Sequence, residues 1–196
     1  MLAMAHAGFV FLSMPKTGST AIQRRFDSRA QLVIRKPPTM KHMRARTFEQ
    51  RIAPTLAAYG FPRESYELVC LVREPVDWAA SWWRYRARPG FEGKPRYTGG
   101  MSFEEFAEQI LAGEVHLGSS ATFVSDLDGN VIVERVYRYE HLEQASAWMA
   151  DRLGVDLPAP DRANASPERE LDVSPRLRAR LEEHYAADVE VYRSAL

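Results

Sequence analysis

The sequence predicts an α/β fold, a three-layer sandwich with helices on both faces of a short, mainly parallel sheet. Short runs rich in β-forming residues alternate along the chain with segments whose apolar residues repeat at helical spacing. Those runs are apolar throughout, which is typical of strands buried on both faces. The 196 residues, 45% of them hydrophobic, are enough to bury a sizeable core without disulfides or metals. We therefore expect one domain that spans residues 1–196.

Composition excludes several other classes of protein. The single cysteine, Cys70, excludes a disulfide framework and a zinc site with several cysteines. No apolar run approaches the ~20 residues of a membrane-spanning helix, and residues 1–14 are apolar but lack the basic start of a signal peptide. Aromatic residues make up 11% of the chain, which argues against disorder. These features predict a cytoplasmic protein with no membrane span.

The elements of the first half follow from apolar runs and the turn residues that bound them. The expected strands lie over residues 8–13, 31–34 and 66–72. The expected helices lie over residues 21–30, 48–59 and 75–88. Gly60 ends the second of these helices, and Pro75 stands at the first position of the third, where its missing N–H costs nothing.

The second half begins with a loop and a capped helix. Residues 89–101 contain six glycines and prolines, and a loop of this length inside a compact domain is usually functional or mobile. Ser102 and Glu105 form a capping box that opens a helix to residue 110. The remaining elements are a pair of strands (122–124 and 131–137) around an Asp128–Asn130 turn, a helix (142–153), a turn-rich linker (158–167) and a final helix (177–192).

Charge is distributed unevenly although the net charge is zero. Residues 1–100 contain 17 Lys and Arg against 7 Asp and Glu, whereas residues 101–196 contain 9 against 19. This separation predicts that the first half faces an anion. The alternative is that the two halves neutralise each other within the fold.

A first candidate anion site follows the first expected strand. The segment reads Pro15-Lys16-Thr17-Gly18-Ser19-Thr20. Gly18 permits a tight turn, and the free N–H groups and dipole of the following helix form a site of phosphate size, to which three hydroxyls and the Lys16 ammonium add donors. The segment is not a Walker A loop, because its lysine precedes the glycine. The alternative is a helix capped by Ser or Thr with a chance lysine.

A second candidate site follows the strand over residues 66–72. Arg73 stands at the carboxyl end of that strand, and Ser81 follows eight positions later on the next helix. Ligands of parallel sheets bind beyond the carboxyl ends of the strands, so Arg73 is expected to face the same crevice as Lys16. An arginine fork and a hydroxyl suit a second phosphate. Taken alone, an exposed arginine and a helical serine are the plainer interpretation.

Together these segments resemble the sulfotransferase family, whose donor is 3′-phosphoadenosine 5′-phosphosulfate (PAPS). Residues 15–20 are similar to the PK[ST]G[ST][ST] element that binds the 5′-phosphosulfate, and Arg73 and Ser81 match the Arg and Ser that bind the 3′-phosphate. Residues 136–142 are similar to an R-[FY]-E-x-L element, and residues 174–192 resemble the last helix of the family. The resemblance thus covers nearly the whole chain.

The resemblance implies a P-loop NTPase-like sulfotransferase fold and the transfer of a sulfuryl group from PAPS to an oxygen or nitrogen of an acceptor, without a metal. Lys16 is then the cation that stabilises the leaving oxygen, and Thr17, Gly18, Ser19 and Thr20 hold the 5′-phosphate. In-line transfer of this kind needs positioning and charge stabilisation above all.

The resemblance also indicates a general base. His42 lies in a Lys-His-x-x-Ala-Arg stretch that is similar to one in the carbohydrate-type branch of the family, where the histidine lies near the acceptor. A histidine titrates near neutral pH, as a base for a hydroxyl acceptor requires. The alternatives are that His42 is a surface histidine, that His116 is the base, or that a glutamate takes this role.

The acceptor is expected to be a carbohydrate-like or small hydroxylated molecule. Residues 24–51 contain nine Lys and Arg against two acidic residues and suit an anionic acceptor, while nucleic acid is not expected because the run lacks interleaved aromatics. Because the chain is short, residues 89–101 and 113–121 are expected to form most of the acceptor surface. Trp82 and Trp83 either stack on a ligand or belong to the core. The alternative functions are an inactive homologue that binds 3′,5′-ADP and a P-loop kinase-like phosphotransferase.

Overall fold

A five-stranded sheet organises the molecule, and the computed structural model describes residues 1–157 and 169–196. The strands are β1 (Leu2–Met4), β2 (Phe9–Phe11), β3 (Leu32–Val33), β4 (Glu67–Val72) and β5 (Arg135–Arg138). Their order is β3-β1-β2-β4-β5, with β2, β4 and β5 mutually parallel and β1 antiparallel to both of its neighbours. Val10 pairs with Leu68 and Cys70 with Val136, so the central strands are in register along their length.

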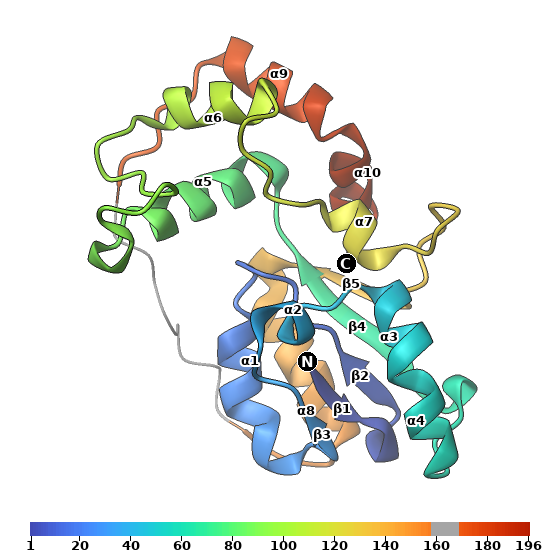
Figure 1. Ribbon diagram of the computed structural model, residues 1–196. Coiled ribbons are helices and arrows are strands. Elements are labelled where there is room, and N and C mark those ends of the chain that lie inside the picture. The colour runs from blue at the N-terminus through green and yellow to red at the C-terminus, as the bar shows by residue number, and fades with distance from the viewer. Residues whose placement is uncertain (158–168) are drawn as a thin grey trace.

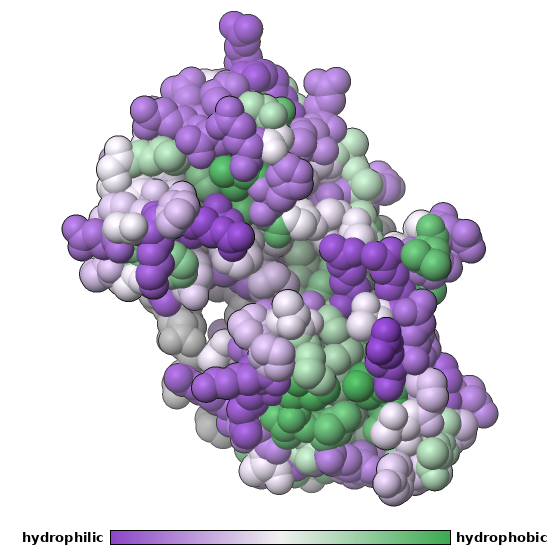
Figure 2. Space-filling view, in the orientation of Figure 1, coloured by the Kyte–Doolittle hydropathy of each residue, from purple (hydrophilic) through white to green (hydrophobic). Residues whose placement is uncertain are grey.

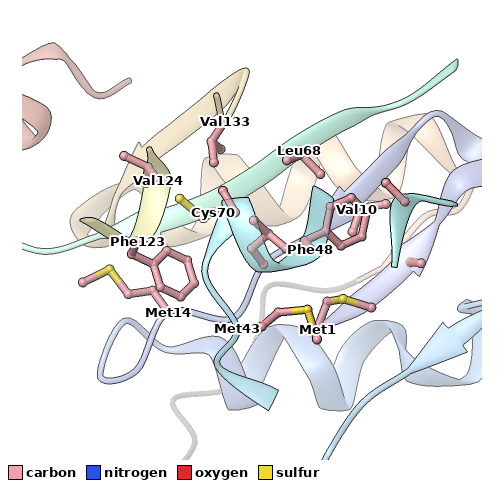
Figure 3. Packing of buried hydrophobic residues seen from close by; sticks show 14 of the residues in the cluster. Met1, Val10, Met14, Met43, Phe48, Leu68, Cys70, Phe123, Val124 and Val133 are labelled. Atoms are coloured by element: carbon pink, nitrogen blue, oxygen red, sulfur yellow. The ribbon is translucent and has the colours of Figure 1, made fainter. Parts of the chain in front are cut away.

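Helices cover both faces of the sheet (Figure 1). One face packs against α1 (Ser19–Phe26) and α8 (Leu142–Arg152). The other packs against α3 (Ala45–Arg51), α4 (Ala53–Ala58), α7 (Ser120–Val124) and α10 (Ala186–Ser194), as the close packing in Figure 3 shows for Phe48, Leu68, Cys70 and Phe123. The predicted three-layer α/β sandwich with a mainly parallel sheet is therefore confirmed.

A third apolar cluster lies to one side of the sheet. It joins α5 (Pro75–Arg86), α6 (Phe103–Leu111) and α9 (Pro175–His184). Pro75 begins α5 as predicted, and the Ser102–Glu105 capping box opens α6. Figure 2 shows that the visible face is hollowed between these helices and the part of the molecule that contains the sheet. The short helix α2 (Pro38–Lys41) lies on the sheet side of that hollow in Figure 1.

Residues 1–14 form two strands instead of one. Gly8 adopts a left-handed conformation with φ of 77°, and the chain reverses there so that β1 and β2 pair antiparallel. The expected strands over 31–34 and 66–72 are present as β3 and β4. The added strand β1 explains why the sheet is mixed at one edge although its centre is parallel.

The prediction of a strand at Thr122–Val124 is wrong, because these residues belong to helix α7. Ser119 accepts a hydrogen bond from the backbone N–H of Thr122, and the buried Asp188 carboxylate accepts from the N–H of Ser120. These two caps stabilise a helix where the local residues favour a strand. The Asp128–Asn130 turn is present and is closed by a single bridge between Ser125 and Val131, but β5 starts only at Arg135.

Two expected helices are each divided. Pro54 lacks an N–H group, and the helix expected over 48–59 breaks at Ile52 into α3 and α4. The helix expected over 177–192 breaks at Tyr185 into α9 and α10, which pack into different clusters. The helix over 142–153 is confirmed as α8, while the linker expected over 158–167 lies outside the described residues. No helix in the described ranges is long and apolar enough to cross a membrane.

Candidate functional site

The candidate site begins at the loop between β2 and α1, residues 13–18, which we call the anion loop. Lys16 and Gly18 both adopt left-handed conformations, with φ of 68° and 71°. Gly18 is the N-cap of α1, so the N–H groups of Ser19 and Thr20 have no partner within the helix. A turn of this kind places successive N–H groups around a concavity that suits an anion.

Gly18 also makes room for the third sequence element, residues 136–142. A Cβ atom at Gly18 would lie 2.4 Å from Leu142 Cδ1 and 3.2 Å from Tyr139 Cε2. The distance to Leu142 is shorter than real Cβ contacts, so the Leu142 side chain would have to shift, and a left-handed φ is itself costly for other residues. Glycine is therefore favoured twice at this position, by the turn and by the side chains packed against it.

The hydroxyl groups of this segment differ in their roles. The Thr17 hydroxyl donates a hydrogen bond to the carbonyl of Met14 over 3.0 Å and is fully buried, so it holds the loop in shape. Ser13 Oγ, directly before the loop turns, is buried and has no hydrogen-bond partner among the described residues. Ser19 is buried at the start of α1, and the hydroxyl of Thr20 accepts from Lys41 Nζ over 3.4 Å.

Lys16 is a confined cation. Its Nζ lies 4.2 Å from the ring centroid of Tyr85 and 6.0 Å from that of Trp82. Burial lowers its pKa to about 8, and repulsion by Arg88 and Arg73 contributes. None of the ion pairs within residues 1–157 and 169–196 includes Lys16. A cation held in this way without a carboxylate is typical of a site that receives an anion.

The structure brings Arg73 to the anion loop. Arg73 Nη1 donates to the carbonyl oxygen of Lys16 over 3.4 Å, while Nε pairs with Asp77 one turn along α5. The Arg73 guanidinium also lies 4.5 Å from the ring centroid of Tyr139. Nearby, Trp78 Nε1 donates to the carbonyl of Pro15 over 2.9 Å and fixes α5 against the loop. The three sequence elements thus meet at one place.

Ser81 is less directly connected. It is buried on α5, eight positions after Arg73 as in the sequence pattern. Within the described chain no hydrogen bond joins Ser81 to Arg73 or to the anion loop. Its assignment to a second phosphate therefore stays a prediction.

His42 lies next to the anion loop, directly after α2. Its Nδ1 atom is 2.6 Å from the carbonyl oxygen of Ser13. A carbonyl oxygen only accepts hydrogen bonds, so Nδ1 carries the proton and the neutral ring presents a lone pair at Nε2. Burial lowers the pKa of His42, with the Ser13 hydrogen bond acting against it and the neighbouring Lys41 charge acting with it. A neutral imidazole with a free Nε2 is equipped to accept a proton.

His116, the other candidate base, lines a neighbouring pocket and does not lie at the anion loop. The pocket is formed by residues at the end of α5, in the following loop and on α6. No hydrogen bond in the described chain links it to the anion loop. Its side chain is exposed, in contrast to the half-buried His42.

Three residues of this site were not foreseen from the sequence as members of it. Tyr85 stands one helical turn after Ser81, so the spacing of α5 carried a signal for it. Tyr139 belongs to the third sequence element, and Lys41 precedes His42 directly. The contacts of Tyr85 with Lys16, of Tyr139 with Arg73 and of Lys41 with Thr20 are long-range and follow only from the fold.

Comparisons with known proteins bear on the fold alone. No family model matches the chain, and no curated protein matches its sequence. Among solved structures the chain is similar to the crystal structure of the mouse sulfotransferase SULT7A1 complexed with PAP, at 17% sequence identity and a TM-score of 0.40. The match covers 97% of this chain and 67% of the mouse protein. At this identity and TM-score it carries no information about ligands.

Proposed function

We propose that this protein is a sulfotransferase that transfers a sulfuryl group from PAPS to a hydroxyl or amine of a carbohydrate-like or small acceptor. The observation that carries the proposal is the hydrogen bond between Arg73 and the carbonyl of Lys16. It joins the two sequence elements that resemble the phosphosulfate and 3′-phosphate sites of the family. Both elements carry a cation, and the fold holds the two cations together against their mutual repulsion.

The residues of the anion loop fit a phosphosulfate. Hydroxyls and successive backbone N–H groups bind such an anion. This loop supplies the Ser13 hydroxyl, which has no partner in the described chain, the left-handed turn at Lys16 and Gly18, and the N–H groups at the start of α1. When bound, PAPS supplies the activated sulfuryl group. Arg73 is assigned to the 3′-phosphate together with Ser81, and its pairing with Asp77 sets the orientation of the guanidinium.

Lys16 and His42 are assigned to the transfer. The Lys16 ammonium stabilises the negative charge that develops on the oxygen left behind on the phosphate. The Nε2 atom of His42 takes the proton of the acceptor hydroxyl while a new S–O bond forms and the S–O bond to the donor breaks. The hydrogen bond from Nδ1 to Ser13 holds the ring in the required tautomer.

Two measurements test the proposal. We expect 3′,5′-ADP to raise the melting temperature, and ATP with magnesium to do so much less, because ligand that binds only the native state stabilises it. A transfer assay with labelled PAPS against glycans, phenols, steroids and lipid head groups then identifies the acceptor. Preferential stabilisation by ATP with magnesium would support a kinase-like phosphotransferase, and binding of 3′,5′-ADP without transfer to any acceptor would support an inactive homologue. A cytoplasmic location and a single domain over residues 1–196 stay predictions from the sequence.

A further inference from the structure

The pocket that His116 lines is polar and lies beside α5, on the side that faces α6. It has a volume of about 290 Å³. Its walls come from the end of α5, from residues 95–101, from α6 and from residues 114–116. The two segments expected to form the acceptor surface, 89–101 and 113–121, therefore meet at this pocket. The volume is just below the range of about 300–1,000 Å³ for small-molecule sites, so the pocket suits a small group.

Arg86 is the notable residue of this pocket. It is only 7% exposed, and its guanidinium lies 5.5 Å from the ring centroid of Trp82 and 5.7 Å from that of Phe106. No ion pair in the described ranges includes Arg86. Burial lowers its pKa, and repulsion by Arg96, which lines the same pocket, adds to the effect.

Two other half-buried arginines of this chain have carboxylate partners, whereas Arg25 and Arg138 donate to main-chain carbonyls. Arg63 pairs with Glu49 and Glu134, and Arg73 pairs with Asp77. A buried charge without such a partner is costly unless another group compensates it. The aromatic rings around Arg86 compensate part of this cost, but they leave its charge unneutralised. An anion in the pocket would provide the missing counter-charge.

The pocket is close to the proposed reaction centre. Lys16 Nζ and the Arg86 guanidinium lie 6.0 Å and 5.5 Å from the centroid of the same Trp82 ring, which places them within about 12 Å of each other. Both cations thus lie near the same Trp82 ring. A molecule held by one end in the pocket is near enough to present another group toward Lys16.

We propose that this pocket binds an oxyanion of the acceptor, a carboxylate or a sulfate ester, between Arg86 and Arg96. That the anion is part of the acceptor rests on the proposed function, whereas the existence of the anion site does not. Glu114 also lines the pocket but pairs with neither arginine in the described chain. Its negative charge opposes anion binding and gives the proposal a second test of opposite sign.

The test measures the affinity for inorganic sulfate and for acetate by calorimetry at constant ionic strength, with chloride as the replaced ion. Saturating 3′,5′-ADP fills the anion loop in one series. A second series uses Lys16→Ala without nucleotide, so that the result does not depend on nucleotide binding. The variants are Arg86→Met, Arg96→Ala and Glu114→Gln, with Lys94→Ala as the matched control, since Lys94 is an exposed cation of the same loop outside the pocket lining.

We expect Arg86→Met and Arg96→Ala each to weaken the binding of the preferred anion about tenfold, the effect of one lost charge-assisted hydrogen bond. Lys94→Ala should leave it unchanged, and Glu114→Gln should strengthen it. Whichever of sulfate and acetate binds more tightly identifies the anion of the acceptor. An affinity that depends on neither arginine, or that falls equally in Lys94→Ala, overturns the proposal. If Arg86→Met does not fold, the variants of the exposed Arg96 and Glu114 still test whether the pocket binds the anion. Failure of 3′,5′-ADP to bind would count against the proposed function alone.

Discussion

The ammonium group of Lys16 lies 4.2 Å from the centroid of the Tyr85 ring, and no carboxylate of the described chain pairs with it. The ring holds the cation in place without neutralising it. An ion pair at this position would compete with a bound anion, and the aromatic contact does not. The arrangement leaves the positive charge available for the charge that develops during transfer.

Substitution of Lys16 by Ala should lower turnover about 10²–10³-fold, the usual effect of removing one electrostatic donor from a transition state. The affinity for 3′,5′-ADP should fall much less, because the charge on the leaving oxygen develops mainly in the transition state. Steady-state kinetics and calorimetric titration of 3′,5′-ADP measure the two effects. Tyr85→Phe keeps the ring and is the matched control. A raised KM for the donor with unchanged turnover would assign Lys16 to binding alone.

Lys16 should also make stability depend on pH. Its pKa is about 8 in the folded protein against 10.5 ordinarily, so between these values the folded state binds fewer protons than the unfolded state. The charged lysine therefore destabilises the fold below pH 8, and this cost disappears as the pH rises toward 10.5. Lys16→Met should be more stable than the wild type at pH 7, with a difference that shrinks above pH 8. Denaturant unfolding at several pH values measures it, and a difference that is constant with pH would contradict the assignment.

The fold class could be predicted from the sequence because it depends on local patterns. Apolar runs and helical spacing are properties of short stretches of sequence. The Ser102–Glu105 capping box and the position of Pro75 are local in the same sense. The predictions of secondary structure fail where contacts with residues far away in the sequence determine the local structure. Helix α7 depends on Asp188, which is 68 positions away, and its own residues favour a strand. The break between α3 and α4, in contrast, was signalled by Pro54.

The candidate site divides in the same way. The turn at residues 15–20 and the position of Arg73 at the end of a strand could be predicted, since both follow from a strand, a glycine and a helix start. The tautomer of His42 depends on the Ser13 carbonyl, which only the fold brings within 2.6 Å. The contacts of Lys16 with Tyr85 and of Arg86 with Phe106 likewise join separate elements, and no spacing in the sequence encodes them.

The 3′-phosphate should account for a large part of nucleotide affinity. We expect 3′,5′-ADP to stabilise the protein more than 5′-AMP, because each lost charge-assisted hydrogen bond costs about 1.5–3 kcal/mol. Arg73→Gln should remove most of that difference while leaving the response to 5′-AMP nearly unchanged. Thermal shifts at matched ligand concentrations measure both effects. Equal shifts with the two nucleotides in the wild type would remove the case for a 3′-phosphate site at Arg73 and Ser81.

Replacing Gly18 by Ala should cost more than the same change at another left-handed glycine. Gly113 has a φ of 76° and open space where a methyl group would lie, whereas a Cβ at Gly18 meets Leu142 at 2.4 Å. Both substitutions incur the left-handed cost of about 1–2 kcal/mol, and only Gly18→Ala adds the steric one. Denaturant unfolding should therefore show a larger loss for Gly18→Ala, and adding Leu142→Ala should recover part of it. Equal losses at Gly18 and Gly113 would mean that the packing of residues 136–142 on the loop is loose.

His42→Ala should strongly slow transfer to a hydroxyl acceptor, with a residual rate that can still be measured, and leave 3′,5′-ADP affinity near that of the wild type. A general base contributes roughly 10²–10⁴ in rate, and His42 contacts the loop through the Ser13 carbonyl without belonging to either phosphate element.

The pH dependence of the rate separates the roles of His42 and Lys16. Since burial lowers the pKa of His42 below 6.5, the base becomes neutral below that pH, and kcat/KM should rise with pH there. The rate should fall again as Lys16 loses its proton near pH 8, which gives a bell-shaped profile. His42→Ala should remove the acidic limb and keep the basic one, while Lys16→Ala should do the reverse. His116→Ala is the control and should keep both limbs. An inactive His116→Ala with an active His42→Ala would reverse the assignment, and activity in both variants would favour a carboxylate base.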